Sequence, residues 1–270
     1  MARTLIGGVF VAAFSTVLAL PLSADERKFT YSNEAKTLPS GSFEIEQWAT
    51  LAARKDSGTF REWHFREEFE YGVTDRFNAA AYLNWEAKTI HDVPGLAEEK
   101  DARFAGISLE GKYKLTDAAA DPLGTLLYAE FSFEQDELEI ELKGVASKSW
   151  GNWTFAYNLI LETDWLGQLD PATGRRAWQH EIVVENTAGV SYSFLPVLAA
   201  GVEALARTPW DNHLDREQTA WFVGPNVHVA AGPLWGTLTF LRQVDPHGHN
   251  RLNLDAYEKY EVRLIVGINF

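Results

Sequence analysis

Acidic and basic side chains recur at every second position over most of this sequence, in runs such as Glu137, Glu139 and Glu141. This spacing places them on one face of a β-strand. Rings of carboxylates around an enclosed passage select cations, so the pattern is typical of a pore lining. We expect one shared interior to be lined by Glu62, His64, Arg66, Glu68, Glu86, Glu110, Lys112, Glu130, Glu139, Glu141, Lys143, Asn158, Glu162, Glu181, Glu185, Glu203, Asn226, His228, Glu261 and Arg263.

Carboxylates outnumber cations in this interior set, and the whole chain has a net charge of −14. An open passage with this lining would favour cations over anions. Because carboxylates repel one another at close range, we expect opposite charges to pair across neighbouring strands. The same charges could instead pair into a closed, packed interior, and the sequence leaves both possibilities open.

Catalytic and metal-binding arrangements are weakly represented. Nucleophilic catalysis needs a base within reach of an activated Ser or Cys, but the chain has no Cys, and none of its seven His stands two residues before a Ser. His228 shares a strand face with Asn226, which indicates a polar interior contact. His247 and His249, with Asp245, could bind a metal in a loop, but solvated loop His residues are common. We therefore predict no catalytic residue, no metal site and no cofactor, with a hydrolase as a less favoured alternative.

The segments that carry these charges follow a period of two from residue 41 onward. Trp63, Phe65 and Phe69, for example, alternate with charged residues, and about twelve such strands can be counted before the C-terminus. Their connections alternate between short turns, such as GVTD at 72–75, and longer links, such as TPWDNHLDRE at 208–217. Tight turns at one end and long loops at the other are typical of an up-and-down barrel.

A soluble β-sandwich also alternates, with its apolar faces buried between two sheets. Two features favour a membrane barrel instead. Aromatic residues such as Tyr71, Phe77, Trp85 and Tyr113 stand near strand ends, where interfacial girdles lie, and strands of about ten residues match a tilted bilayer span. Since lipid tolerates no open sheet edge, the sheet must close. We predict an all-β fold, a transmembrane up-and-down antiparallel β-barrel of about 12 strands, with its apolar faces on lipid.

The N-terminal region divides into two predicted parts. Residues 1–24 combine Arg3, an apolar run and a small-residue site at Ser23 and Ala24, which is typical of a secretory signal peptide. An uncleaved anchor helix is the alternative. No later run of 18 or more apolar residues exists, which excludes helical membrane spans. We predict residues 25–41 as an irregular leader or plug segment and residues 42–270 as the barrel.

The last strand ends on Phe270, with apolar residues at alternate positions before it. This arrangement resembles the C-terminal signal read by the assembly machinery of the bacterial outer membrane. We assign that signal to Tyr260, Val262, Leu264, Val266, Ile268 and Phe270, and we expect this strand to pair with the first one. Ile265 is the one apolar residue on its otherwise polar face.

Three stretches carry a family resemblance: FEYGVTDRFNAAAYLNW (69–85), WFVGPNVHVA (221–230) and VRLIVGINF (262–270). They resemble strands and turns of uncharacterised outer-membrane barrels grouped near the phenol meta-pathway transporters. The resemblance implies an outer-membrane barrel with a channel or transport role. Its motifs are structural, and no catalytic residue is carried over from it.

We therefore expect a porin-like protein of the Gram-negative cell outer membrane, exported through the periplasm, that acts as a channel or transporter for small solutes. Its expected partners are outer-membrane lipid, the assembly machinery and a small-molecule solute. A chain this acidic, without a phosphate-binding loop or a basic stripe, is not expected to bind nucleic acid. The alternatives are a plugged structural barrel and an adhesion or receptor barrel without transport.

Overall fold

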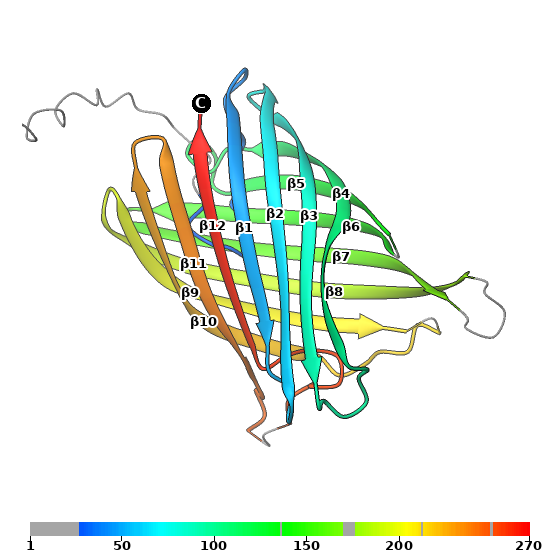
Figure 1. The fold of residues 1–270 in the computed structure, drawn as a ribbon. Coiled ribbons are helices and arrows are strands. Elements are labelled where there is room, and N and C mark those ends of the chain that lie inside the picture. Colours follow the sequence, from blue (N-terminus) through cyan, green and yellow to red (C-terminus); the bar gives the residue numbers. More distant parts are fainter. Residues whose placement is uncertain (1–26, 136, 170–175, 212, 249–250) are drawn as a thin grey trace, which may run out of the picture.

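The chain forms a closed sheet of antiparallel strands, shown by a computed structural model (Figure 1). The structure describes residues 27–135, 137–169, 176–211, 213–248 and 251–270. Its strands are β1 (Phe43–Ala53), β2 (Thr59–Thr74), β3 (Phe77–His91), β4 (Glu99–Thr116), β5 (Gly124–Glu134), β6 (Glu137–Trp150), β7 (Trp153–Leu169), β8 (Arg176–Leu195), β9 (Leu198–Trp210), β10 (Ala220–Ala231), β11 (Leu234–Val244) and β12 (Tyr260–Asn269). Within the described residues, no helix is long and apolar enough to cross a membrane. The expectation of a closed all-β barrel of about twelve strands is confirmed.

The first and last strands close the barrel. β1 pairs with β2 on one side and with β12 on the other, and the β1–β12 register runs from Glu44 opposite Asn269 to Ala53 opposite Tyr260. Every other strand pairs with its two neighbours in sequence. Closure of this kind removes the exposed sheet edges that would otherwise recruit another chain or face lipid unsatisfied.

The connections separate into two ends of the barrel. Short turns follow β6, β8 and β10, and the C-terminus lies at the same end, which we call the short-turn end (top of Figure 1). The opposite, long-loop end carries the links after β1, β3, β9 and β11. Two links have lengths unusual for their end. The link 117–123 after β4 lies at the short-turn end, and the short β5–β6 link lies at the long-loop end.

Half of the strands are longer than the roughly ten residues that a tilted span requires. β2, β3, β4, β6, β7 and β8 have 14 to 20 residues, so the expected length was wrong for these six. Trp85, expected near a strand end, accordingly stands inside β3. Its Nε1 donates a hydrogen bond to Glu67 Oε2 over 2.7 Å on the outer face. The long strands make one side of the barrel taller than the other.

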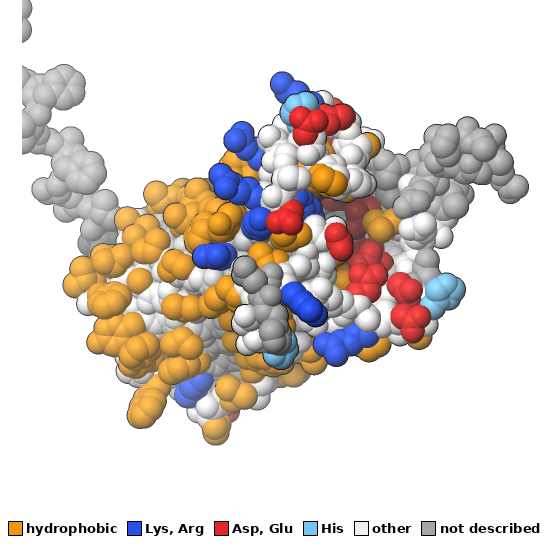
Figure 2. All heavy atoms as spheres, turned by 90° about the horizontal axis from the view of Figure 1, so that it is seen from below, with side chains coloured by type: hydrophobic (Ala, Val, Ile, Leu, Met, Phe, Trp, Pro, Cys, Tyr) orange, Lys and Arg blue, Asp and Glu red, His pale blue; other side chains and the backbone are white. Residues whose placement is uncertain are grey.

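Apolar side chains cover the outside of the wall, and polar ones point inward. Leu109, Leu127 and Leu159 expose 51%, 54% and 51% of their surface, whereas Tyr128 and Glu130 on the inner face of β5 are buried. Figure 2 shows the apolar side chains spread over one flank of the barrel. Exposed apolar surface of this extent is unusual for a monomeric soluble protein. The apolar face of each strand therefore lies on the outside of the barrel. In a β-sandwich this face would be buried between two sheets.

A charge placed at mid-height on this outer face tests its contact with lipid. Leu142 is 48% exposed and pairs with Ala129 at the centre of β5. We expect Leu142→Arg to lower the free energy of unfolding by about 2–4 kcal/mol in lipid vesicles, as a cation at the bilayer midplane does. Guanidinium titration measures it, with Leu96→Arg in the exposed β3–β4 loop as the control. Equal effects at both positions would place Leu142 in water.

Candidate functional site

The side chains expected in the interior all stand on inward-facing positions of their strands, at three heights. Near the short-turn end lie Glu68, Glu110, Lys112, Asn158, Glu203, Asn226 and His228. At mid-height lie Arg66, Glu130, Glu139, Glu141, Lys143, Glu162, Glu185, Glu261 and Arg263. Toward the long-loop end lie Glu62, His64, Glu86 and Glu181. Their role in lining a conducting pore stays a prediction.

Lys112 is the centre of a buried acidic cluster near the short-turn end. Its Nζ lies 3.0 Å from carboxylate oxygens of Glu70 and Glu110 and 3.8 Å from Glu68, and its side chain is only 2% exposed. Tyr82 Oη also donates a hydrogen bond to Glu110. Buried charges are costly unless they are paired and hydrogen-bonded. The Lys112 ammonium group is therefore the shared counter-ion of three carboxylates.

Two further buried carboxylates, Glu44 and Glu46, extend this cluster and were not among the residues expected from the sequence. Trp235 Nε1 donates to Glu44 Oε1, and Trp48 Nε1 donates to Glu46 Oε2 over 2.7 Å. Arg27 Nε lies 3.6 Å from Glu46 Oε1. The alternation in FEIEQWAT could have predicted their inward position, because both carboxylates lie on the face of β1 opposite its apolar residues.

The N-terminal segment enters the barrel as irregular chain, and we call residues 27–38 the plug. A fully buried carboxylate, Glu203 of β9, accepts hydrogen bonds from the backbone N–H groups of Thr30 (3.0 Å), Tyr31 (3.0 Å) and Ser32 (2.9 Å). Thr239 Oγ1 donates a further one at 2.6 Å. Successive backbone N–H groups that converge in this way form an anion-binding nest. Glu203 thus holds the centre of the plug against the wall.

Other strands hold the plug from different sides. Asn158 of β7 bonds Asn33 in both directions: its Oδ1 accepts the Asn33 N–H at 2.6 Å, and its Nδ2 donates to the Asn33 carbonyl at 3.0 Å. The Ala35 N–H donates to Ser147 Oγ of β6 at 2.8 Å, and Asn226 Nδ2 of β10 donates to a plug carbonyl. Asn158 and Asn226 were expected in the interior, but the pattern held no sign that they bind the chain's own backbone.

The plug also packs against the inner wall. Phe29 is 1% exposed and lies over Gly189 of β8, where a Cβ atom would come within 2.6 Å of its ring. Tyr31 packs in a buried cluster with Phe222 and Leu241, two apolar side chains that point inward. The plug therefore fills much of the short-turn half of the interior.

On the long-loop side of the plug, arginine side chains and aromatic rings bound the remaining space. Arg66 forms an ion pair with Glu130 and lies over Tyr82, 4.0 Å from the ring centroid. The Arg263 guanidinium lies 4.1 Å from the ring centroid of Tyr31 in the plug. Cation–π contacts of this kind become stronger when they are shielded from water. They hold both guanidinium groups at the edge of a cavity of about 180 Å³, which we call the central cavity.

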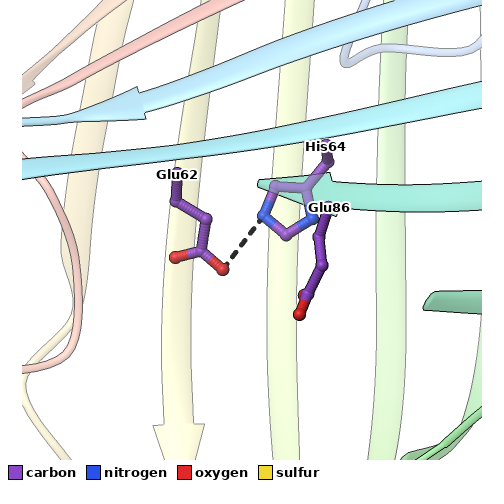
Figure 3. Close-up of side chains that lie close together, drawn as sticks. All are labelled: Glu62, His64 and Glu86. Atoms are coloured by element: carbon purple, nitrogen blue, oxygen red, sulfur yellow. Dashed lines mark ion pairs between the residues drawn. The ribbon is translucent and has the colours of Figure 1, made fainter. Parts of the chain in front are cut away.

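Toward the long-loop end, Glu62 and His64 of β2 and Glu86 of β3 point into one space (Figure 3). His64 Nε2 lies 3.3 Å from Glu62 Oε1, and the three side chains offer possible ligand atoms within 4.8 Å of one another. Lys88 Nζ already lies 3.1 Å from Glu62 and 3.6 Å from Glu86, and Arg103 Nε lies 2.5 Å from Glu86. Protein cations thus neutralise the carboxylates that a metal ion would need.

The wall formed by β5 to β8 differs from the rest, because many of its carboxylates have no cation. Among the described residues, no ion pair is formed by Glu134, Glu137, Glu139, Glu162, Asp164 or Glu181, which we call the acidic wall. Glu139 faces Asp164, and Asp164 faces Glu181, across neighbouring strands. The expectation that opposite charges pair across strands is therefore wrong here. Figure 2, seen from the long-loop end, shows acidic side chains gathered on one side.

The β3–β4 loop supplies a pH-dependent contact outside the wall. Glu98 Oε1 accepts the Asp92 N–H at 2.8 Å, and Glu98 Oε2 lies 2.7 Å from His91 Nδ1. The backbone hydrogen bond and then the His91 contact lower the pKa of Glu98. A lowered carboxyl pKa stabilises the folded loop above the unfolded value of about 4.3, and this stabilisation is lost as the pH falls through the folded value.

We therefore expect the Asp92 amide to lose its protection against hydrogen exchange on acidification from about pH 5 to about pH 3. The reason is that a protonated Glu98 is a weaker acceptor for that N–H group. Amide exchange corrected for intrinsic rates measures the effect. In Glu98→Gln the amide should be weakly protected at both pH values, and an unchanged pH profile in that variant would contradict the assignment.

One comparison decides the family. Residues 21–270 match a family described as "Family of unknown function (DUF6662)". The chain belongs to this family. No curated protein matches the sequence of this DUF6662 member.

Solved structures with a similar fold include two bacterial barrels. The translocator domain of autotransporter NalP from Neisseria meningitidis is 14% identical, with a TM-score of 0.55 over 85% of this chain and 88% of that chain. A NanC porin is 12% identical, with a TM-score of 0.48 over 84% of this chain and 98% of that chain. At these identities the likeness concerns the fold alone. The NalP likeness agrees with the closed β-barrel fold, and neither match points to the phenol meta-pathway transporters.

Two sequence expectations fall partly outside the described residues. The expected signal peptide, residues 1–24, lies outside them, and so does His249 of the loop His pair. His247 lies in the β11–β12 link, where its N–H donates to Asp245 Oδ1 at 2.8 Å. The assembly signal along β12 stays a prediction.

Proposed function

We propose that this DUF6662 member is an outer-membrane channel or transporter that admits small cationic solutes from the long-loop end and passes them when the plug leaves the interior. The observation that carries the proposal is the plug itself. Hydrogen bonds, packing and the Arg27–Glu46 ion pair hold it across the interior, and no disulfide ties it to the wall. A closed barrel filled by its own wall side chains would need no such segment.

The outer face supports placement in a membrane. Exposed apolar side chains at alternating positions match the lipid-facing band of outer-membrane barrels, whose short turns face the periplasm. The plug enters from that end: the Ser40 N–H donates to Asp75 Oδ1 at 2.9 Å, and the Gly41 N–H donates to the Gly72 carbonyl at 2.8 Å. We propose lipid and the assembly machinery, through the β12 signal, as partners on this basis.

The contacts of the plug suit a segment that can move. Its hydrogen bonds to neutral groups each contribute about 0.5–1.5 kcal/mol net, and those to the Glu203 carboxylate about 1.5–3 kcal/mol, because bonds to water replace them when the plug is released. The segment is irregular over residues 27–42, so no strand pairing has to break when it shifts. The acidic wall supports cations as the solutes that reach it. Aromatic solutes, implied by the phenol-pathway resemblance, have less support from this charged lining.

A disulfide that locks the plug tests the proposal. The Ala35 N–H donates a hydrogen bond to Ser147 Oγ at 2.8 Å, so the plug and β6 touch at this pair of residues, and the chain contains no cysteine of its own. We expect Ala35→Cys with Ser147→Cys to carry about tenfold less KCl current in planar bilayers when oxidised than when reduced, because a tethered plug cannot leave.

Ser147→Cys alone, treated with the same oxidant, is the matched control and should carry current in both states. Equal currents from the oxidised and reduced double variant would show that the plug does not gate the path. No current from any form at any voltage would favour the alternative, a permanently plugged barrel that acts as a structural element or a receptor.

A further inference from the structure

We infer that the central cavity binds a basic amino acid, or another small molecule with one carboxylate and two separated ammonium groups. This inference rests on the proposed function and specifies its solute. The floor of the cavity is formed by Thr30, Tyr31 and Asn33 of the plug, and its walls come from β1, β2, β5 to β9 and β12. Its volume of about 180 Å³ far exceeds the roughly 10–15 Å³ that one water needs.

Most charges around the central cavity are already paired. Arg66 pairs with Glu130, Lys143 with Glu141 at 3.0 Å, Arg207 with Glu185 at 2.5 Å, and Arg27 with Glu46 at 3.6 Å. Of the cavity-lining residues, this leaves Arg263, Glu139 and Glu162 without an ion pair within the described chain. The cavity thus presents one guanidinium group and two carboxyl groups that form no ion pair among the described residues.

Arg263 is held in place by neutral groups and forms no ion pair among the described residues. Its Nε donates to Thr50 Oγ1 at 2.9 Å, and its Nη1 donates to the Thr30 carbonyl at 3.2 Å. The Tyr31 ring lies against the guanidinium face. These neutral partners orient the group without supplying an anion. A planar guanidinium fixed in this way is suited to bind a carboxylate.

Glu139 and Glu162 supply the opposite charge from β6 and β7. Glu139 is flanked by Asp164 on the facing strand, and Glu162 faces Glu141, so each carboxylate has another beside it. Like charges at such positions destabilise the sheet unless a cation reaches them. Two ammonium groups and one carboxylate on a ligand would neutralise Glu139, Glu162 and Arg263 together, which a simple amine or a neutral amino acid would not do.

A hydroxyl group gives independent support for a ligand. Thr187 lines the central cavity, is 1% exposed, and its Oγ1 has no hydrogen-bond partner in the described protein. Buried hydroxyl groups are rarely left unpaired, because the lost hydrogen bond to water is not replaced. A polar ligand in the cavity would satisfy it.

The acidic wall leads from the long-loop end toward this cavity. Asp164 and Glu181 lie beyond Glu162 in that direction, and neither forms an ion pair with a cation in the part of the chain that the structure describes. A passage lined by one sign of charge raises the local concentration of oppositely charged solutes and speeds their entry. Ligands with excess positive charge are therefore concentrated at the long-loop side of the central cavity.

Calorimetric titration of the full refolded chain in detergent tests the inference. The probes are L-lysine, L-norleucine, which lacks the side-chain ammonium, and cadaverine, which lacks the carboxylate. We expect lysine to bind roughly tenfold or more tightly than either, because each analogue leaves a buried charge unpaired. Glu162→Gln should weaken lysine binding about tenfold and leave norleucine unchanged, whereas Arg263→Lys should weaken lysine but not cadaverine.

Glu98→Gln, in the exposed β3–β4 loop, is the matched control and should bind lysine like the unmodified chain. Equal binding of the three probes, or no lysine binding at millimolar concentration, would overturn the inference. If Glu162→Gln does not refold, Glu139→Gln and the three-probe comparison answer the same question. If the barrel conducts current but binds the three probes equally, the binding site is rejected and the channel is not. If the barrel binds lysine selectively but conducts no current, the channel is rejected and the binding site is not.

Discussion

Removal of residues 27–38 should raise the single-channel conductance of the refolded barrel by about an order of magnitude. The plug occupies the short-turn half of the interior, where Glu203, Asn158 and Ser147 hold its backbone. Barrels of eight strands are filled by their own side chains and those of sixteen hold open channels, so a twelve-stranded barrel becomes open or closed according to what lies inside it. Planar-bilayer recording in KCl measures the change.

A point substitution separates plug displacement from damage caused by the deletion. A Cβ at Gly189 would lie 2.6 Å from the Phe29 ring, so Gly189→Val should push the plug away and increase the current in the same direction. Gly144→Val on β6 is the matched control, because a Cβ there meets nothing within 4 Å. If the deletion variant folds but conducts no more than the full chain, the plug is not the barrier.

The second large effect concerns stability. We expect Lys112→Met to lower the free energy of unfolding by about 3–5 kcal/mol, the usual cost of leaving buried charges without their partner. Its ammonium is the shared cation of Glu68, Glu70 and Glu110, and all four side chains are buried. Urea unfolding in lipid vesicles, followed by tryptophan fluorescence, measures the loss.

Two further variants make this result specific. Lys100→Met removes a cation from an exposed position of β4 and should change the free energy of unfolding by less than about 0.5 kcal/mol. Adding Glu70→Gln to Lys112→Met should recover part of the loss, because one uncompensated carboxylate is removed. A loss in Lys112→Met no larger than in Lys100→Met would mean that the buried carboxylates do not depend on this ammonium group.

The sequence by itself determined the parity of the strands and therefore the barrel. Residues such as Leu109 and Leu127 alternate with Glu110 and Glu130, and this period of two is a local property of the backbone that survives in any sheet. A β-sandwich alternates in the same way, and the aromatic residues near strand ends favoured a closed sheet in lipid over it. The same period predicted the faces of many interior residues, although Glu44 and Glu46 of β1 were missed.

Only the tertiary structure decided what the interior contains. Trp48 and Ile265 both point inward, although their types suggest the lipid face, and they form a small buried apolar cluster with Trp235 of β11. The partners of Glu203 are backbone N–H groups more than 170 residues away in the chain, which no side-chain pattern records.

The pairing of charges around the central cavity also depends on strand register and on the length of the side chains. Glu139 stands opposite Asp164 because of how β6 and β7 are aligned, and Arg207 reaches Glu185 and Glu261 on different strands. A period of two fixes the face on which a side chain lies but not its height along the barrel or its neighbour across it. Which charges are neutralised and which remain for a ligand is therefore a property of the closed barrel, because Coulomb interactions depend on distances that only folding sets.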